Sequence, residues 1–141
     1  MKPSGYATAK YHKYDNILHL TIGGDSQHYG DRTPAVFLHP KRGILVSSAV
    51  NGESAYGFWC RQHQPKAGIW TEYAVSQVKK EGDKHIYSIS INGEEVHRTV
   101  NTRPEVFKDV GVFASNPWDG NPSSLYSIRN LKIDSEITGI T

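Results

Sequence analysis

The chain has 141 residues, of which 37% are hydrophobic and 11% aromatic, and this length supports one domain with a core of its own. Its formal net charge is only +2, and its lysines and arginines are too scattered to form the phosphate-neutralising stripe that nucleic-acid binding requires. No apolar run approaches the ~20 residues of a membrane-spanning helix, so we set aside nucleic-acid binding and membrane insertion.

Short segments rich in β-branched and aromatic residues recur along the chain, separated by glycine, proline and asparagine. No segment repeats its apolar residues at the spacing of a long helix. The predicted strands are, in chain order, Tyr6–Tyr11, Asn16–Ile22, Pro34–His39, Ile44–Val50, Ala55–Cys60, Ile69–Val78, Lys84–Ile91, Glu94–Val100, Val110–Ser115 and Leu125–Ile133. This pattern predicts an all-β fold, with residues 1–141 forming a single antiparallel β-sandwich or barrel domain of about ten strands.

The hairpin of residues 84–100 is the clearest of these elements. Asn92-Gly93 supplies two residues suited to the positive φ angles of a type I′ turn. The bulky face of the hairpin needs a second layer of sheet to cover it. From the alternation of apolar residues we expect an inward-facing set formed by Tyr87, Ile89, Ile91, Leu18, Leu20, Ile22, Val110 and Val112. On the same argument, His19 is expected to be an exposed sheet residue.

Cys60 is the only cysteine, which excludes an internal disulfide. Because it alternates with Tyr56 and Phe58, Cys60 is predicted to be a small buried hydrophobic residue. Residues 1–10 lack the basic start and apolar core of a signal peptide. Either the protein is cytoplasmic or a signal has been removed, and the sequence leaves both open.

Two long connections carry more polar and aromatic side chains than a simple chain reversal needs. The first spans Gly23 to Thr33, and the second spans Asn116 to Ser124. Shallow sugar sites combine an aromatic platform with planar hydrogen-bonding side chains. The candidate carbohydrate-binding residues are His28, Tyr29, Asp31 and Arg32 in the first loop and Asn116, Trp118, Asp119 and Asn121 in the second.

The same residue types also have structural interpretations. Asp31 and Arg32 precede Thr33-Pro34 and are equally suited to clamping their own loop. Trp118 follows a proline and is suited to covering one end of a sandwich. Trp59 and Trp70 lie in predicted strands, so we assign both mainly to packing.

The motifs NILHLTIGG, YGDRTPAVFLHP, GILVSSAVNG, GIWTEYAVSQV, YSISINGEEVH, FKDVGVFASNPW and SIRNLKI follow one another from Asn16 to Ile133. This order resembles the laminin-G-like and concanavalin-like jelly-roll sandwiches of extracellular animal proteins. The resemblance implies a jelly-roll topology and an extracellular binding module, commonly for sugars or matrix partners. The chain does not resemble a galectin, because Trp70-Thr71-Glu72 breaks the spacing of the galectin sugar-binding strand.

Catalytic and metal chemistry find little support in the sequence. A glycosidase of this architecture needs two carboxylates on one strand face, but Glu94 and Glu95 are adjacent and Glu72 has no acidic partner on its strand. Hard oxygen ligands suited to calcium are present on loops, at Asp25, Asp31, Asp119 and Asn121. Because no fixed-spacing calcium loop accompanies them, we predict neither a metal nor any other cofactor.

The function expected from the sequence is that of a non-enzymatic, lectin-like module that binds a glycan through its end loops. The alternative is an extracellular-matrix or cell-adhesion module whose ligand is a protein. A shallow sugar site makes few contacts, so single-site affinity should be weak, and several copies are needed for avidity. We therefore expect a homo-oligomer, either a dimer or a tetramer.

Overall fold

The computed structural model describes residues 2–3, 15–114 and 126–134. These residues contain strands and one short 3-10 turn, Glu81–Asp83, and no α-helix. The strands are β1 (Lys2–Pro3), β2 (Asp15–Thr21), β3 (Ala35–His39), β4 (Gly43–Val50), β5 (Glu53–Trp59), β6 (Tyr73–Lys79), β7 (His85–Ile91), β8 (Glu94–Asn101), β9 (Gly111–Phe113) and β10 (Tyr126–Ser127).

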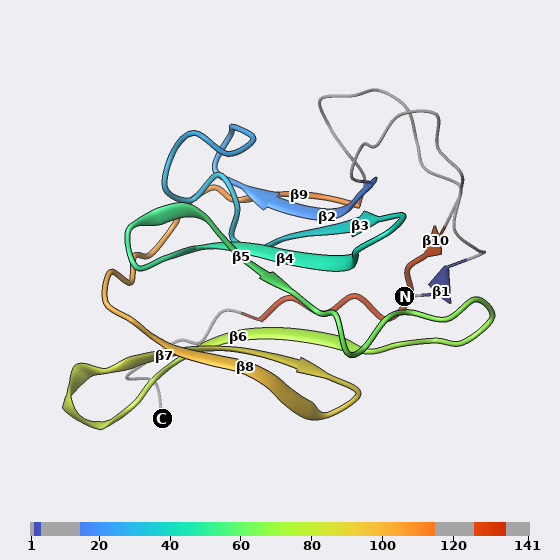
Figure 1. The fold of residues 1–141 in the computed structure, drawn as a ribbon. Coiled ribbons are helices and arrows are strands. Elements are labelled where there is room, and N and C mark those ends of the chain that lie inside the picture. The colour runs from blue at the N-terminus through green and yellow to red at the C-terminus, as the bar shows by residue number, and fades with distance from the viewer. Residues whose placement is uncertain (1, 4–14, 115–125, 135–141) are drawn as a thin grey trace.

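Two antiparallel sheets of unequal width make up the body of the protein. The larger sheet has the strand order β5-β4-β3-β2-β9, and the smaller one has the order β6-β7-β8. The two sheets lie in separate layers, one above the other (Figure 1). A short pair, β1 and β10, lies beside them. The expected all-β, two-layer architecture is therefore confirmed.

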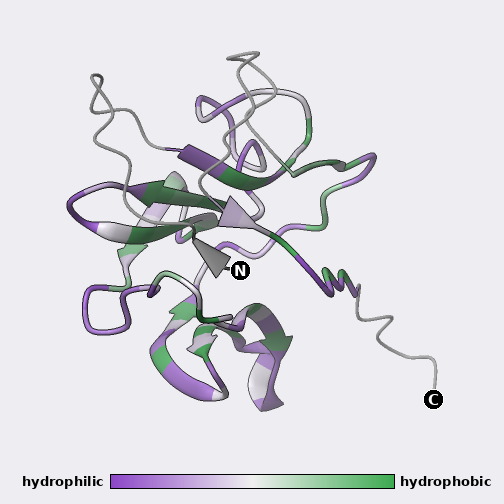
Figure 2. Cartoon of the chain, turned by 90° about the vertical axis from the view of Figure 1, so that its right-hand side faces the viewer, coloured by the Kyte–Doolittle hydropathy of each residue, from purple (hydrophilic) through white to green (hydrophobic). Residues whose placement is uncertain are grey.

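The predicted hairpin is present as β7 and β8. Asn92 and Gly93 have φ angles of 51° and 84°, as a type I′ turn requires. Tyr87, Ile89 and Ile91 are buried while their neighbours are more exposed. The strands of the smaller sheet accordingly show alternating hydrophobic and hydrophilic bands (Figure 2). The hairpin thus covers one side of the core.

Three predicted strands are shorter in the structure. In the segment predicted as Val110–Ser115, the strand covers Gly111–Phe113. The segment predicted as Ile69–Val78 forms a strand only from Tyr73 onward. In the segment predicted as Leu125–Ile133, the strand covers Tyr126–Ser127, and residues 128–134 continue without strand pairing. A positive φ angle of 53° at Asn130 interrupts the extended backbone there. The predicted strand Tyr6–Tyr11 lies outside the described residues.

The core lies between the sheets, and part of the expected inward set was wrong. Ile17 was not in the expected set, but it is buried, because the pairing of β2 with β3 shifts register between Asn16 and Leu18. Ile22 and Val112 are 41% and 47% exposed. Val112 lies on β9, the edge strand of the larger sheet, so the narrower sheet leaves it uncovered. The Cys60 prediction is confirmed, since this thiol is buried in the core cluster.

Ile89 gives the most direct test of this core. Its side chain is fully buried in the middle strand of the smaller sheet, so Ile89→Ala should lower the free energy of unfolding by about 2 to 5 kcal/mol in urea denaturation. The control is Val106→Ala, because Val106 is 90% exposed and its truncation should change stability by less than about 0.5 kcal/mol. Equal effects of the two substitutions would contradict the described core.

Candidate functional site

Asp31, one of the predicted sugar-binding residues, is buried inside its own loop. Its Oδ1 accepts a hydrogen bond from the Gly24 backbone N–H at 3.2 Å, and its Oδ2 accepts one from the His28 N–H at 2.8 Å. Both carboxylate oxygens therefore stabilise the loop backbone. A Cβ added to Gly24 would lie within 3 Å of the Asp31 carboxylate, so the glycine is needed for this close approach. Asp31 acts as a loop clamp rather than as an open hydrogen-bonding group.

Arg32 is also held by the protein. Its Nε donates to the Asp25 carbonyl oxygen at 3.1 Å, and its Nη1 donates to Ser47 Oγ at 3.3 Å. The guanidinium lies 4.7 Å from the centre of the Phe37 ring, a cation–π geometry. Arg32 thus fixes the loop against the outer face of the larger sheet.

Tyr29 and His28 differ in their surroundings. The Tyr29 hydroxyl donates to the Arg103 carbonyl oxygen at 2.6 Å, and the Tyr29 ring packs against Phe107 and the Arg103 guanidinium. The His28 side chain is 79% exposed. Of the four candidates in this loop, His28 is the one most open to a ligand. The other four candidates, Asn116, Trp118, Asp119 and Asn121, lie outside the described residues.

His19 is fully buried, so its expected exposure was wrong. The same loop covers it: its Nε2–H donates to the Asp31 carbonyl oxygen at 2.7 Å, and its Nδ1 lies 2.6 Å from the Asn16 amide. Burial lowers the pKa of His19, which favours the neutral ring. His19 links β2 to the loop and so helps to hold the loop in place.

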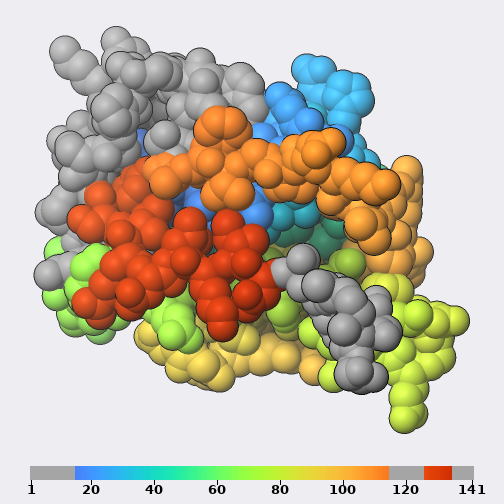
Figure 3. Space-filling view, turned by 180° about the vertical axis from the view of Figure 1, so that it is seen from behind, coloured from blue at the N-terminus to red at the C-terminus, as the bar shows by residue number. Residues whose placement is uncertain are grey.

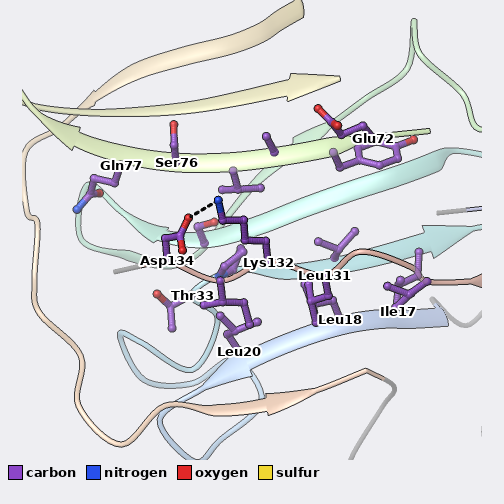
Figure 4. Close-up of a pocket in the computed structure, with 18 of the residues that line it drawn as sticks. Ile17, Leu18, Leu20, Thr33, Glu72, Ser76, Gln77, Leu131, Lys132 and Asp134 are labelled. Carbon is purple, nitrogen blue, oxygen red and sulfur yellow. Dashed lines mark ion pairs between the residues drawn. The ribbon is translucent and has the colours of Figure 1, made fainter. Parts of the chain in front are cut away.

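A cleft lies between the two sheets of the described structure. It has a volume of about 840 Å³, which is within the range of small-molecule sites. One wall is aliphatic and comes from the larger sheet, with Ile17, Leu18 and Leu20. The opposite wall comes from β6, and residues 128–134 cross between the two walls (Figure 4). From behind, residues 126–134 lie across the space between the sheets, beside a hollow in the surface (Figure 3).

Polar and aromatic groups gather at the end of the cleft where β6 begins. Trp70 lines this end, and the Arg129 guanidinium lies 4.1 Å from the centre of its ring. Glu72 and Asn92 join the lining, and the Asn92 side chain accepts a hydrogen bond from the Glu72 N–H at 2.9 Å. Asn130 lines the cleft as well. This end of the cleft therefore combines an aromatic ring with amide, carboxylate and guanidinium groups.

The far end of the cleft adjoins the loop identified from the sequence. The Asn101 amide donates to Gln77 Oε1 at 2.6 Å, and both residues line the cleft. Phe107 lines it too, and its ring is 5.9 Å from that of Tyr29. The cleft runs from Trp70 to the neighbourhood of this predicted loop.

Cross-sheet contacts close the sandwich on the side away from the cleft. The Tyr56 hydroxyl on β5 lies 2.8 Å from His97 Nε2 on β8, and the His97 ring stacks on Phe58 with 4.4 Å between centroids. Nearer the middle, Ser48 Oγ is 2.7 Å from the Tyr87 hydroxyl. Burial raises the pKa of Tyr87 to about 12, so this hydroxyl stays neutral at pH 7 and acts in hydrogen bonding.

Two carboxylates of the cleft lining lie close to cationic groups. Asp134 lies 3.4 Å from Lys132 Nζ, and Glu105 lies 3.5 Å from the Arg103 guanidinium. Among the described residues, no group of three or more His, Cys, Asp or Glu side chains is placed to hold a metal ion.

Comparison of the chain with protein-family models, with curated proteins and with solved structures gives no significant match. Within residues 2–3, 15–114 and 126–134, no helix is long and apolar enough to cross a membrane.

Sequence reasoning missed the cleft for an identifiable reason. Trp70 and Arg129 are 59 positions apart, and each lies in a segment predicted to be an ordinary strand. The signal available in the sequence was the alternation in the GIWTEY segment. In an extended chain, Trp70 and Glu72 lie on one face and Thr71 on the other. Only the tertiary fold places this segment beside residues 128–134.

His19 and His97 predict how stability depends on pH. Burial lowers the pKa of both rings from the ordinary 6.5, so below about pH 6.5 the unfolded chain binds more protons than the folded one. Their contribution to stability is complete above pH 6.5 and is lost as the pH falls through the lowered values. Urea denaturation between about pH 5 and 7.5 should show stability rising with pH. His97→Phe should reduce this slope, and an unchanged slope would contradict the assignment.

Proposed function

We propose that the protein is a non-enzymatic module that binds a glycan at the Trp70 end of the cleft. The observation that carries the proposal is the combination of Trp70, Glu72, Asn92, Arg129 and Asn130 along one end of the cleft. A sugar presents a weakly apolar C–H face together with hydroxyls in fixed directions. An aromatic ring beside planar hydrogen-bonding groups matches both properties.

The burial of Asp31 and the contacts of Arg32 within the protein support this location over the loop of residues 23–33. Their polar groups already contact the loop backbone or the larger sheet, so a ligand would have to displace these bonds at a cost. The loop adjoins the far end of the cleft through Tyr29, whose ring packs against Phe107 of the cleft lining.

A protein ligand is the second candidate, and the aliphatic wall of the cleft favours it. Ile17, Leu18 and Leu20 offer surface suited to the apolar side chains of an extended peptide rather than to hydroxyls. This alternative corresponds to a matrix or cell-adhesion module. Under either proposal the module is extracellular, has jelly-roll connectivity and performs no catalysis.

Glycan-array binding with single-site variants tests the glycan proposal. The wild type should bind one family of saccharides. Trp70→Leu and Arg129→Gln should each weaken that binding about tenfold, because each removes half of the stacked aromatic and cationic pair. His28→Ala serves as the control, since His28 is exposed on the loop, and it should retain most of the binding.

The array also has outcomes that contradict the proposal. If His28→Ala lost binding while Trp70→Leu kept full binding, the site would lie on the loop of residues 23–33 and not at the Trp70 end of the cleft. A blank array would reject the glycan proposal. The next experiment would then be selection from a displayed library of extended peptides with alternating apolar residues. Binding of such peptides by the wild type, and its loss in Leu18→Ser, would favour the protein ligand.

A further inference from the structure

Cationic side chains gather at the end of the sandwich where β6 begins. Lys41 and Arg42 lie on the turn between β3 and β4, and Arg61 and Lys66 lie on the connection between β5 and β6. The turn and the connection are at the same end of the molecule (Figure 1). All four residues are exposed. Together they form a surface that we call the basic end.

Hydrogen bonds to the backbone hold the basic end together. Gln64 Nε2 donates to the carbonyl oxygens of Arg42, at 3.0 Å, and of Arg61, at 3.3 Å. Two segments that are distant in sequence therefore share one donor and lie side by side. Gly43 allows this contact, because a Cβ at that position would overlap the Gln64 amide. The backbone positions of the two arginines are thus fixed relative to each other.

The basic end leads directly into the Trp70 end of the cleft. The Ile69 N–H donates to the Lys66 carbonyl oxygen at 3.2 Å, so the chain turns immediately before Trp70. Arg129, whose guanidinium lies over the Trp70 ring, adds another exposed cation on this side. A saccharide that lies at Trp70 and extends toward residues 61–69 therefore meets cationic groups.

These cations lack the carboxylate partners that cations elsewhere in the protein have. Among the described residues, neither the four side chains of the basic end nor Arg129 form an ion pair. Glu94, near the same end, lies 3.4 Å from His63 instead. By contrast, a carboxylate lies close to each of Arg32, Lys79, Arg98, Arg103 and Lys132. Like charges held side by side repel each other, and a bound anion removes that repulsion.

We infer that the glycan proposed to bind at Trp70 is acidic, and that the basic end binds its carboxylate or sulfate groups. The inference rests on the proposed function and names the class of saccharide. Guanidinium groups form paired hydrogen bonds with carboxylates and with tetrahedral oxyanions, and lysine adds a mobile point charge. A neutral saccharide makes no use of this charge.

A glycan array with matched pairs of saccharides tests the inference. The two members of a pair have the same sugar sequence and differ in one sulfate or carboxylate group. The wild type should bind the acidic member about tenfold more tightly at low salt, because charge-assisted hydrogen bonds are added. This preference should shrink as the salt concentration rises, since exposed charges are screened. Sulfate pairs and carboxylate pairs on one array show which group is preferred.

Neutral variants of the two arginines locate the preference on the protein. Arg42→Gln and Arg61→Gln each remove one charge and keep the carbonyl oxygen that Gln64 binds. Each should reduce the preference for the acidic member about threefold, as expected for an exposed charge, and the double variant should lose most of it. The matched control is Lys84→Gln, because Lys84 is exposed at the other end of β6. It should keep the wild-type preference.

Gln64→Ala separates a built surface from general attraction by net charge. It keeps every charge but removes the shared donor that places Arg42 beside Arg61. The preference for the acidic member should fall, whereas attraction by net charge alone would not change. An unchanged preference in this variant would contradict the arrangement.

Other outcomes would overturn the inference while leaving the proposed function in place. One is equal binding of the acidic and neutral members by the wild type. Another is a preference that survives in the Arg42 and Arg61 double variant. A third is competition by polyglutamate that equals competition by the acidic saccharide, since that polymer carries charge but no sugar. A blank array would overturn both the inference and the proposed function.

Discussion

Among the described residues, a sheet of five strands faces a sheet of three, and the rest of the structure depends on this difference in width. The smaller sheet cannot cover the whole inner face of the larger one. The contact between Tyr56 and His97 joins β5 to β8, and the contact between Ser48 and Tyr87 joins β4 to β7 nearer the middle of the sandwich. The uncovered width is therefore left on the other side, beneath β2 and β9.

This mismatch explains both the cleft and the segment that crosses it. An uncovered aliphatic face is unfavourable in water, and residues 128–134 bring Ile128, Leu131 and Ile133 toward it. The covering is incomplete, since Leu131 and Ile133 remain about half exposed. What remains is a hollow with an apolar wall and a polar end.

Much of the fold could be predicted from the sequence, because local patterns specify it. The alternation in residues 85–101 and the Asn92-Gly93 turn predicted the hairpin, and these signals need no knowledge of distant residues. The prediction failed where burial depends on the width of the opposite sheet. Val112 has an inward-facing pattern but is 47% exposed on β9, at one edge of the larger sheet. His19 has an outward-facing pattern but is covered by the loop that ends at Thr33.

The candidate site was harder to predict, for a related reason. Asp31 and Arg32 are the residue types that bind sugars, and they are also the types that hold a glycine-rich loop together. The sequence alone cannot separate these roles, whereas the hydrogen bonds of Asp31 to Gly24 and His28 do. Conversely, Trp70 and Arg129 form a pair only because the chain returns to the start of β6 after residue 125.

The most direct test of the cleft as the binding site is a titration of isotope-labelled protein with a saccharide that it binds. The quantity measured is the change in each backbone amide chemical shift. We expect the largest shifts at Trp70 to Gln77, which line one wall of the cleft, and at residues 128–134, which cross it. Shifts confined to Ser26 to Tyr29, with β6 unchanged, would contradict this account.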